Sequence, residues 1–153
     1  MTYKKGKIFG VLNFDLRPHP IDGSLWIVEN YAGAWGYVTS YGCKCVPLDG
    51  RETDLASVPF LFRRLLPNSG DGKKGNYRFA SVIHDELYKT GYVVDINGIK
   101  RPLMRVEADF IMKDIMQQMG VSAWRVNFIY FALRIGAWYT WNNYRKADNR
   151  KRK

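Results

Sequence analysis

The sequence predicts an α+β protein, with an antiparallel β-sheet in its N-terminal half and three helices in its C-terminal half. Residues 1–52 contain short β-branched and aromatic runs separated by turn-forming residues, whereas residues 53–144 place apolar side chains mainly at helical spacing. The 153 residues are 46% hydrophobic and 15% aromatic, which is enough for one ordinary core. We therefore expect a single domain over residues 1–144, followed by a basic tail at residues 145–153.

Four runs in the first half have the composition of β-strands. Each is rich in β-branched and aromatic residues, and stretches such as RPHPIDG and YGCK separate them. These stretches contain the glycine, proline and aspartate residues that favour turns. The predicted strands of the sheet are Lys7–Phe14, Ser24–Asn30, Trp35–Ser40 and Lys44–Pro47.

Three main helices are expected in the second half, and a shorter one precedes them. Pro59 and Pro67 bracket a short one, because proline is tolerated in the first turn of a helix and stops a helix at its end. Asn76–Thr90 has an apolar stripe and ends before Gly91, a residue that suits a helix C-terminus. A hairpin with Asn97-Gly98 at its turn comes next. The remaining helices are expected at Arg105–Met119 and from the N-cap Ser122 to Tyr144.

Cysteine content and charge limit the class of protein. Cys43 and Cys45 are too close together for an unstrained disulfide and too few for a tetrahedral zinc site, so we expect reduced thiols. The net charge is +10, and the tail Arg145–Lys153 carries six of the basic residues with one acid. Such a tail can bind nucleic acid or an anionic membrane, or it can be a solvated end. No nucleic-acid recognition motif is visible, so nucleic acid is the least favoured partner.

The segment Ala123–Trp141 is close to the roughly 20 residues that a helix needs to cross a bilayer. Its arginines, Arg125 and Arg134, make insertion costly, so we expect a core helix with exposed ends and no transmembrane span. Contact with a lipid surface through Trp138, Trp141 and the basic tail is the alternative. The N-terminal MTYKKGKIFG has no apolar core of a secretory signal.

A candidate site lies on two of the expected helices. His84 borders the apolar stripe of Asn76–Thr90, with Asp85 next to it and Tyr88 one turn later. Asp109 lies at the edge of the following helix's apolar stripe, where a buried carboxylate needs a partner. Antiparallel pairing of the two helices would bring Asp109 against His84.

That contact would have a chemical use. A carboxylate bonded to one ring nitrogen of His84 fixes the tautomer, so the other nitrogen can take a proton from water. Asp85 points about 100° away around the helix and can bind a hard cation such as calcium. Alternatively, His84 is a structural residue and Asp109 pairs with Arg105 one turn earlier. His19, in a turn, is expected to have no role.

The stretch TDLASVP, at residues 53–59, lies where a strand is expected to meet a helix. Asp54 can cap the following turn, or it can face the His-Asp pair as a second metal ligand. No G-x-S-x-G motif supports a nucleophilic serine. Ser57 and Arg105 are candidates for substrate binding.

Three blocks in order, TDLASVP, HDELY at 84–88 and RVEAD at 105–109, resemble a family of phage and prophage proteins of unknown function. This resemblance implies a phage origin, with the protein in the host cytoplasm or the virion and other particle proteins as partners. HDELY followed by the alanine and aspartate of RVEAD is also similar to the secreted phospholipases that cleave the sn-2 ester, and to the phospholipase segment of parvovirus capsids.

The phospholipase similarity implies a phospholipase-like helical half and a division of roles. His84 activates water, Asp85 binds calcium, Asp109 orients His84, and Tyr88 supports Asp109. The expected function is therefore a metal-assisted hydrolase that acts on a phospholipid or a cell-envelope ester or amide. The alternative is a non-enzymatic virion component or accessory protein, in which the same cluster is structural.

Overall fold

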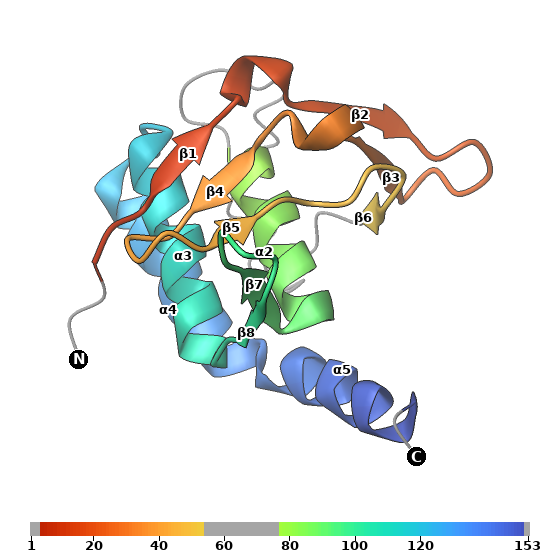
Figure 1. Cartoon of the computed structure of the whole chain (residues 1–153). Helices are drawn as coiled ribbons and strands as arrows, with labels where there is room; N and C mark the ends of the chain where they lie inside the picture. The colour runs from red at the N-terminus through yellow and green to blue at the C-terminus, as the bar shows by residue number, and fades with distance from the viewer. Residues whose placement is uncertain (1–3, 54–76, 152–153) are drawn as a thin grey trace.

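The computed structural model describes residues 4–53 and 77–151, and there the chain forms two antiparallel sheets and four helices (Figure 1). The sheets are built mainly from the N-terminal half, and the helices lie in the C-terminal half. The predicted α+β class is therefore confirmed. The helix expected between Pro59 and Pro67 lies outside the described residues.

The larger sheet has the strand order β1-β4-β5-β7-β8, and each neighbouring pair is antiparallel. Its last two strands are the predicted hairpin, in which Gly98 has a φ of 78°. Asp95 Oδ1 supports the turn by accepting bonds of 2.8 Å from the backbone N–H groups of Asn97 and Ile99. The strands are β1 (Lys7–Phe9), β4 (Gly36–Val38), β5 (Lys44–Cys45), β7 (Tyr92–Val94) and β8 (Lys100–Pro102).

The smaller sheet has the order β2-β3-β6 and contains two strands that were not predicted. β3 (Trp26–Glu29) matches the expected strand at Ser24–Asn30. β2 (Asp15–Pro18) is an edge strand, where the missing N–H of proline is tolerated. β6 (Glu52–Thr53) has two residues, which is too short to show an alternating pattern.

The predicted strand Lys7–Phe14 is interrupted. β1 ends at Phe9, and the 3-10 turn Val11–Asn13 follows it. Gly10 makes the break with a φ of 64°, a conformation that favours glycine. A β-carbon at Gly10 would also collide with the carbonyl oxygen of Ala34.

The two central helices are confirmed as α2 (Arg78–Thr90) and α3 (Arg105–Gln118). The third expected helix is wrong as a single element, because it is α4 (Ala123–Gly136) followed by α5 (Trp138–Lys151). Gly136 weakens the helix, and Ala137 leaves helical geometry with a ψ of 1°. α5 then lies below α2 in Figure 1, and it includes most of the segment that was expected to be a tail.

The main core lies between the larger sheet and the helices α2, α3 and α4, and Figure 1 shows the strands in front of α2 and α3. Phe14, Trp35 and Phe79 form an aromatic cluster, with ring centroids 5.0–5.4 Å apart, that ties the N-terminal half to α2. Cys43 and Cys45 are buried and free, as predicted. Other large and fully buried side chains are Ile83, Leu87, Met112, Ile115, Met116, Ile129 and Leu133.

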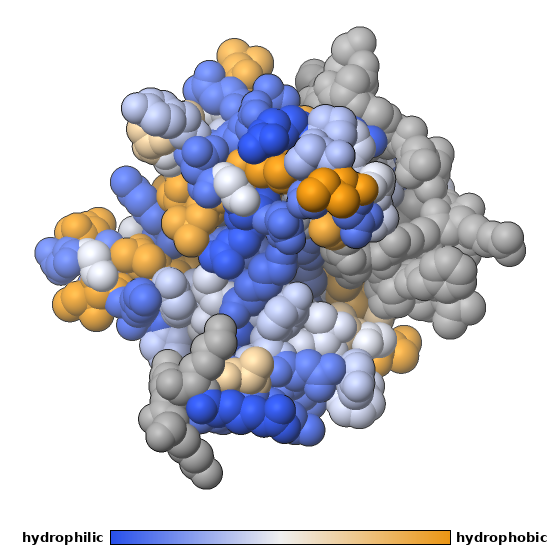
Figure 2. Space-filling view, turned by 90° about the vertical axis from the view of Figure 1, so that its right-hand side faces the viewer, coloured by the Kyte–Doolittle hydropathy of each residue, from blue (hydrophilic) through white to orange (hydrophobic). Residues whose placement is uncertain are grey.

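The surface is mixed in character. Figure 2 shows one face of the molecule, on which hydrophilic residues predominate and hydrophobic residues form small separate groups. Such a pattern is ordinary for a folded chain, whose surface always keeps some apolar atoms.

Candidate functional site

The pairing of α2 with α3 brings His84 and Asp109 into contact in the core. His84 Nε2 lies 3.0 Å from Asp109 Oδ1, which is hydrogen-bond distance. The side chains are 1% and 0% exposed, so water screens this contact little. Both residues lie on faces that the helices bury: Ile83 and Leu87 pack beside His84, and Ala108 beside Asp109.

Tyr88, one turn after His84 on α2, also contacts Asp109. Its hydroxyl donates to the same Oδ1 atom of Asp109 at 2.5 Å, and its ring lies against the ring of His84 with centroids 4.1 Å apart. Trp141 of α5 covers Tyr88 with a ring-centroid distance of 5.1 Å. Tyr88 therefore contacts both partners and links them to the last helix.

Arg134 of α4 contacts Asp109 from the other side. Its Nη1 lies 2.7 Å from Asp109 Oδ2, a close charge-assisted hydrogen bond. The sequence interpretation treated Arg134 only as an obstacle to membrane insertion and missed this contact. The available signal was an arginine on a largely apolar helix, because such a charge needs a partner when it packs against a core.

Arg105 contacts α4 more closely than it contacts Asp109. Its guanidinium donates to the carbonyl oxygens of Leu133 and Arg134 at 3.2–3.3 Å, at the C-terminal end of α4. The expected intrahelical pair with Asp109 also exists, at 3.9 Å. Arg105 thus stabilises the α3–α4 pairing, and its assignment to substrate binding stays a prediction.

The surroundings of Asp109 favour its charged form. Burial would raise the pKa of Asp109, but hydrogen bonds from His84, Tyr88 and Arg134 outweigh burial and hold the pKa below its usual value. For Tyr88, burial and the Asp109 charge act together and raise the pKa well above its usual value. Asp109 is therefore an anion, and Tyr88 is a neutral donor to it.

The second ring nitrogen of His84 has a different environment. Nδ1 is buried and has no hydrogen-bond partner in the part of the chain that the structure describes. A buried polar atom without a partner is uncommon, and it is often found where a ligand or water is bound during function. Asp109 therefore contacts Nε2 of His84, whereas Nδ1 has no hydrogen-bond partner among residues 4–53 and 77–151.

The metal-binding prediction finds one of its two ligands in the described residues. Asp85 Oδ2 accepts a hydrogen bond of 2.5 Å from Thr53 Oγ1 on β6. Asp54 and the substrate-binding Ser57 lie outside the described residues. Among residues 4–53 and 77–151, no group of three or more histidine, cysteine or acidic side chains could hold a metal ion. These residues alone do not fit a calcium site, and the chemistry below uses no metal.

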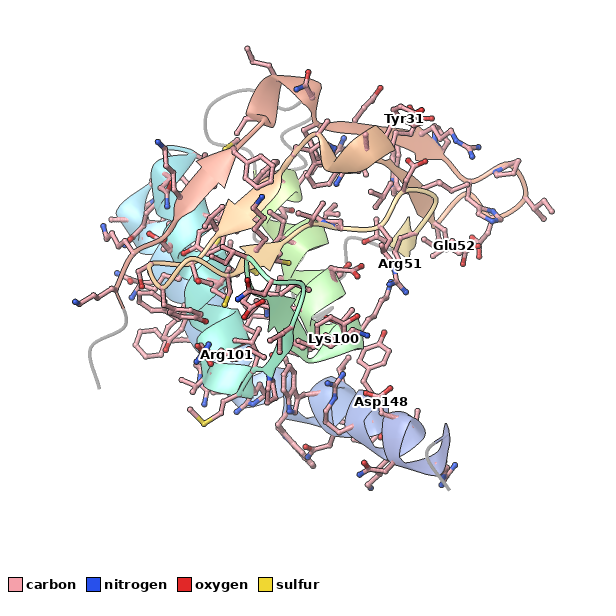
Figure 3. All side chains as sticks on the ribbon, in the orientation of Figure 1. Tyr31, Arg51, Glu52, Lys100, Arg101 and Asp148 are labelled. Carbon is pink, nitrogen blue, oxygen red and sulfur yellow. The ribbon has the colours of Figure 1, made fainter. Side chains whose placement is uncertain are left out.

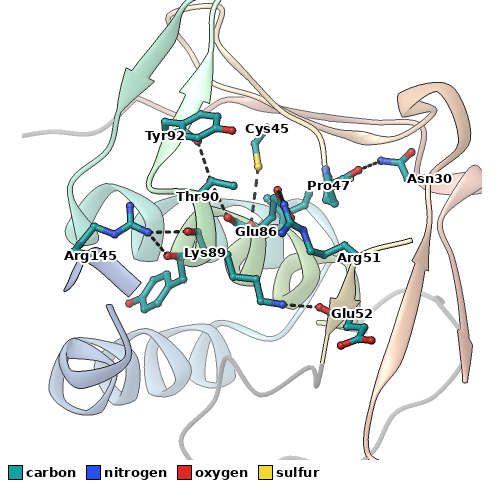
Figure 4. Close-up of polar contacts among 12 residues, drawn as sticks. Asn30, Cys45, Pro47, Arg51, Glu52, Glu86, Lys89, Thr90, Tyr92 and Arg145 are labelled. Carbon is teal, nitrogen blue, oxygen red and sulfur yellow. Dashed lines mark hydrogen bonds and ion pairs between the residues drawn. The ribbon is translucent and has the colours of Figure 1, made fainter. Parts of the chain in front are cut away.

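Two other polar clusters are anchors between elements. Arg51 donates to Glu86 at 3.0 Å, next to the bond from Lys89 Nζ to the carbonyl oxygen of Glu52 (Figure 4). Burial and the nearby Glu86 charge raise the pKa of Cys45, so its thiol is unreactive. These two bonds hold β6 and the preceding residue, Arg51, against α2.

The second cluster joins the hairpin to α3. Arg101 lies beside α3 in Figure 3, and its guanidinium contacts Glu107 at 3.1 Å. Tyr41 donates to the same carboxylate at 2.7 Å, and burial with this bond raises the pKa of Tyr41 to about 12. The cluster is saturated by its own partners, which is typical of a structural role.

The aromatic residues expected at a lipid surface divide into two groups. Trp138 is 55% exposed, whereas Trp141 is 9% exposed and packs on Tyr88. Trp141 is therefore not available as a surface contact, contrary to its assignment. No helix within the described ranges is long and apolar enough to cross a membrane.

The family comparison covers the helix pair that forms this site. A family model described as "Protein of unknown function (DUF1353)" matches residues 33–133, which include His84, Tyr88 and Asp109 and end just before Arg134. No curated protein and no solved structure matches the chain. The match carries neither a phage origin nor a phospholipase activity, so both stay predictions. Because the match spans more than half of the sequence, the chain belongs to the DUF1353 family, a family of unknown function.

Proposed function

We propose that this protein is a hydrolase in which His84, oriented by Asp109, activates water through its Nδ1 atom. The observation that carries the proposal is the asymmetry of the imidazole ring. Nε2 contacts an anionic carboxylate at 3.0 Å, whereas Nδ1 has no partner in the described residues. This is the arrangement that a histidine general base requires.

The residues have distinct tasks in the proposed reaction. A water oxygen attacks an ester carbonyl carbon while its proton passes to His84 Nδ1, and Asp109 stabilises the resulting imidazolium. The carbon–oxygen bond to the leaving alcohol then breaks, and the Nδ1 proton passes to that oxygen. Tyr88 and Arg134 keep Asp109 charged and fixed, so they are positioning residues.

The proposed substrate class is a phospholipid or a cell-envelope ester. Support comes from the likeness of the HDELY and RVEAD blocks to sn-2 phospholipases, and from the matching contacts among His84, Tyr88 and Asp109. A divalent cation at Asp85, calcium by analogy, and a phage origin are kept as predictions.

Phospholipid hydrolysis tests the proposal. Fatty-acid release is measured for the wild-type chain with calcium, for the wild type with a chelator, and for His84→Ala with calcium. We expect the rate to fall by about 10²- to 10⁴-fold in His84→Ala, because a general base contributes about that factor. A loss in chelator would support the cation. Equal release in all three arms would contradict the proposal.

A structural role is the second candidate, and the burial of the site favours it. His84 and Asp109 are at most 1% exposed, and Asp109 of α3 is bonded from two other helices, α2 and α4. On this account the cluster fixes the helix packing in a non-enzymatic protein, such as a virion component. It predicts that His84→Asn lowers stability and that no esterase activity is found with any variant.

A further inference from the structure

Helix α4 is apolar on two opposite faces. One face, with Val126, Ile129 and Leu133, is buried in the core and packs against α3. The opposite face carries Trp124 and Phe131 at i and i+7. A surface helix normally has one apolar face, so a second one indicates a partner outside the core.

The second face is open to solvent. Trp124, Phe131 and Ile135 are 60%, 63% and 74% exposed, and we call these three residues the α4 apolar face. Trp138 and Tyr139, which begin α5, are also more than half exposed. Clustered exposed aromatic side chains mark an interaction surface rather than ordinary scatter.

The charges around this face are almost all positive. Residues 123–150 contain five basic residues and a single acidic one, Asp148. One cation borders the face directly, because the guanidinium of Arg125 lies 5.3 Å from the ring of Trp124. A second cation, Lys113 Nζ, contacts α4 at the ring of Tyr130, 4.8 Å away. The partner must therefore accept aromatic side chains and offer negative charge.

We infer that the α4 apolar face docks on an anionic phospholipid surface. Trp and Tyr beside Lys and Arg suit the boundary between headgroups and acyl chains, where α4 would lie in the plane of the surface. A second copy fits less well, because two copies would bring their basic helices together. Docking does not require a helix that crosses the membrane, and no helix in the described ranges is long and apolar enough to do so.

The docked helix also reaches the candidate site. Arg134 lies next to Ile135 on α4 and bonds Asp109 at 2.7 Å. Docking would therefore place the His84–Asp109 pair about one helix diameter, roughly 10 Å, from the lipid surface. The inference rests on the proposed function for its choice of a lipid partner, yet docking itself needs no hydrolysis.

Vesicle co-sedimentation of the full chain tests the inference. The probes are vesicles of phosphatidylglycerol with phosphatidylcholine, compared with phosphatidylcholine alone. The wild type should bind the anionic vesicles more tightly, and added salt should weaken that binding. Phe131→Ser/Ile135→Ser should bind them at least about tenfold more weakly, because two exposed apolar side chains no longer enter the lipid.

Two control variants separate docking from other effects. Ile96→Ser, at an 84% exposed position of the hairpin loop, should bind like the wild type. His84→Gln should also bind like the wild type. A wild-type chain that binds the vesicles but releases no fatty acid, or a bound His84→Gln that releases it at the wild-type rate, would refute the proposed function alone. Equal binding to both vesicle types, an equal loss in Ile96→Ser, or a wild-type dimer that the double variant abolishes would overturn lipid docking.

Discussion

Asp109 is the residue at which three helices meet. His84 and Tyr88 of α2 and Arg134 of α4 all contact its carboxylate, which is itself on α3. A buried carboxylate is costly unless it is paired and fully hydrogen-bonded, and this one is. The same contacts that stabilise the charge also fix the orientation of the histidine ring.

The charge on Asp109 predicts a specific acid response. Burial would raise its pKa, but the bonds from His84, Tyr88 and Arg134 lower it below the ordinary 3.8. The unfolded chain therefore takes up the proton first as pH falls. The stabilisation from this group is fully present above about pH 4 and is lost as pH falls from there through the lowered pKa.

Urea unfolding of Asp109→Asn at a series of pH values checks this response. The unfolding free energy of the variant should fall less than that of the wild type between about pH 5 and pH 3, because the group with the lowered pKa is gone. An unchanged slope in Asp109→Asn would show that folding does not lower the pKa of Asp109.

The junction between α2 and α5 is the clearest feature at the scale of elements. Gly91 ends α2 with a φ of 70°, and its N–H bonds to the carbonyl oxygen of Leu87 at 2.8 Å. Arg145 of α5 donates to the carbonyl oxygens of Tyr88 and Lys89 at 2.7 and 2.9 Å. Figure 4 shows Arg145 beside Lys89 at the end of α2. The guanidinium supplies partners to helix-end carbonyl groups that the helix itself leaves unpaired.

Two glycine substitutions separate the backbone from this contact. Gly91→Ala and Gly120→Ala both place a β-carbon at a positive φ, which costs about 1 kcal/mol. The new β-carbon at 91 would also collide with the Arg145 guanidinium, whereas nothing lies near the one at 120. Chemical unfolding should therefore show the larger loss for Gly91→Ala.

The excess loss should depend on Arg145. In an Arg145→Ala background, Gly91→Ala should cost only about as much as Gly120→Ala, since the colliding side chain is absent. Equal losses for the two glycine variants in the wild-type background would contradict the docking of Arg145 on α2.

The elements that the sequence predicted are those with a long or strongly marked pattern. α2 and α3 show several turns of apolar spacing, and the hairpin has an Asn97-Gly98 turn. β2 is missed because DLRP has no β-branched or aromatic residue and ends in proline, and β6 is missed because it has only two residues. The break at Ala137 is missed because apolar and aromatic residues continue across it, although Gly136 weakens the helix there.

Some contacts of the candidate site could be predicted from the sequence, and others could not. The spacing of the two side chains on adjacent helices indicated the contact of His84 with Asp109. The phospholipase resemblance indicated the support from Tyr88. The pairing of Asp85 with Thr53 and of Asp109 with Arg134 depends on which elements pack together. No local pattern encodes that packing, so these contacts required the three-dimensional structure.

At the scale of the whole molecule, the fold gives the helices two surfaces with different uses. The larger sheet covers one side of α2 and α3, and α4 covers another side of α3. α4 then presents its own apolar face outward, beside an excess of basic residues. The proposed water-activating pair and the inferred lipid surface are thus joined through one helix and one residue, Arg134.

The most direct test of the account compares the chain's two histidines in one assay. Fatty-acid release from anionic phospholipid vesicles is measured for His84→Gln and His19→Gln against the wild type. Glutamine at 84 keeps a donor for Asp109 but has no basic nitrogen, and His19 lies in the turn between β2 and β3. We predict that His84→Gln folds and releases fatty acid at least about 10²-fold more slowly than the wild type, with His19→Gln unchanged. A folded His84→Gln that releases fatty acid at the wild-type rate would contradict the role of His84 as the base.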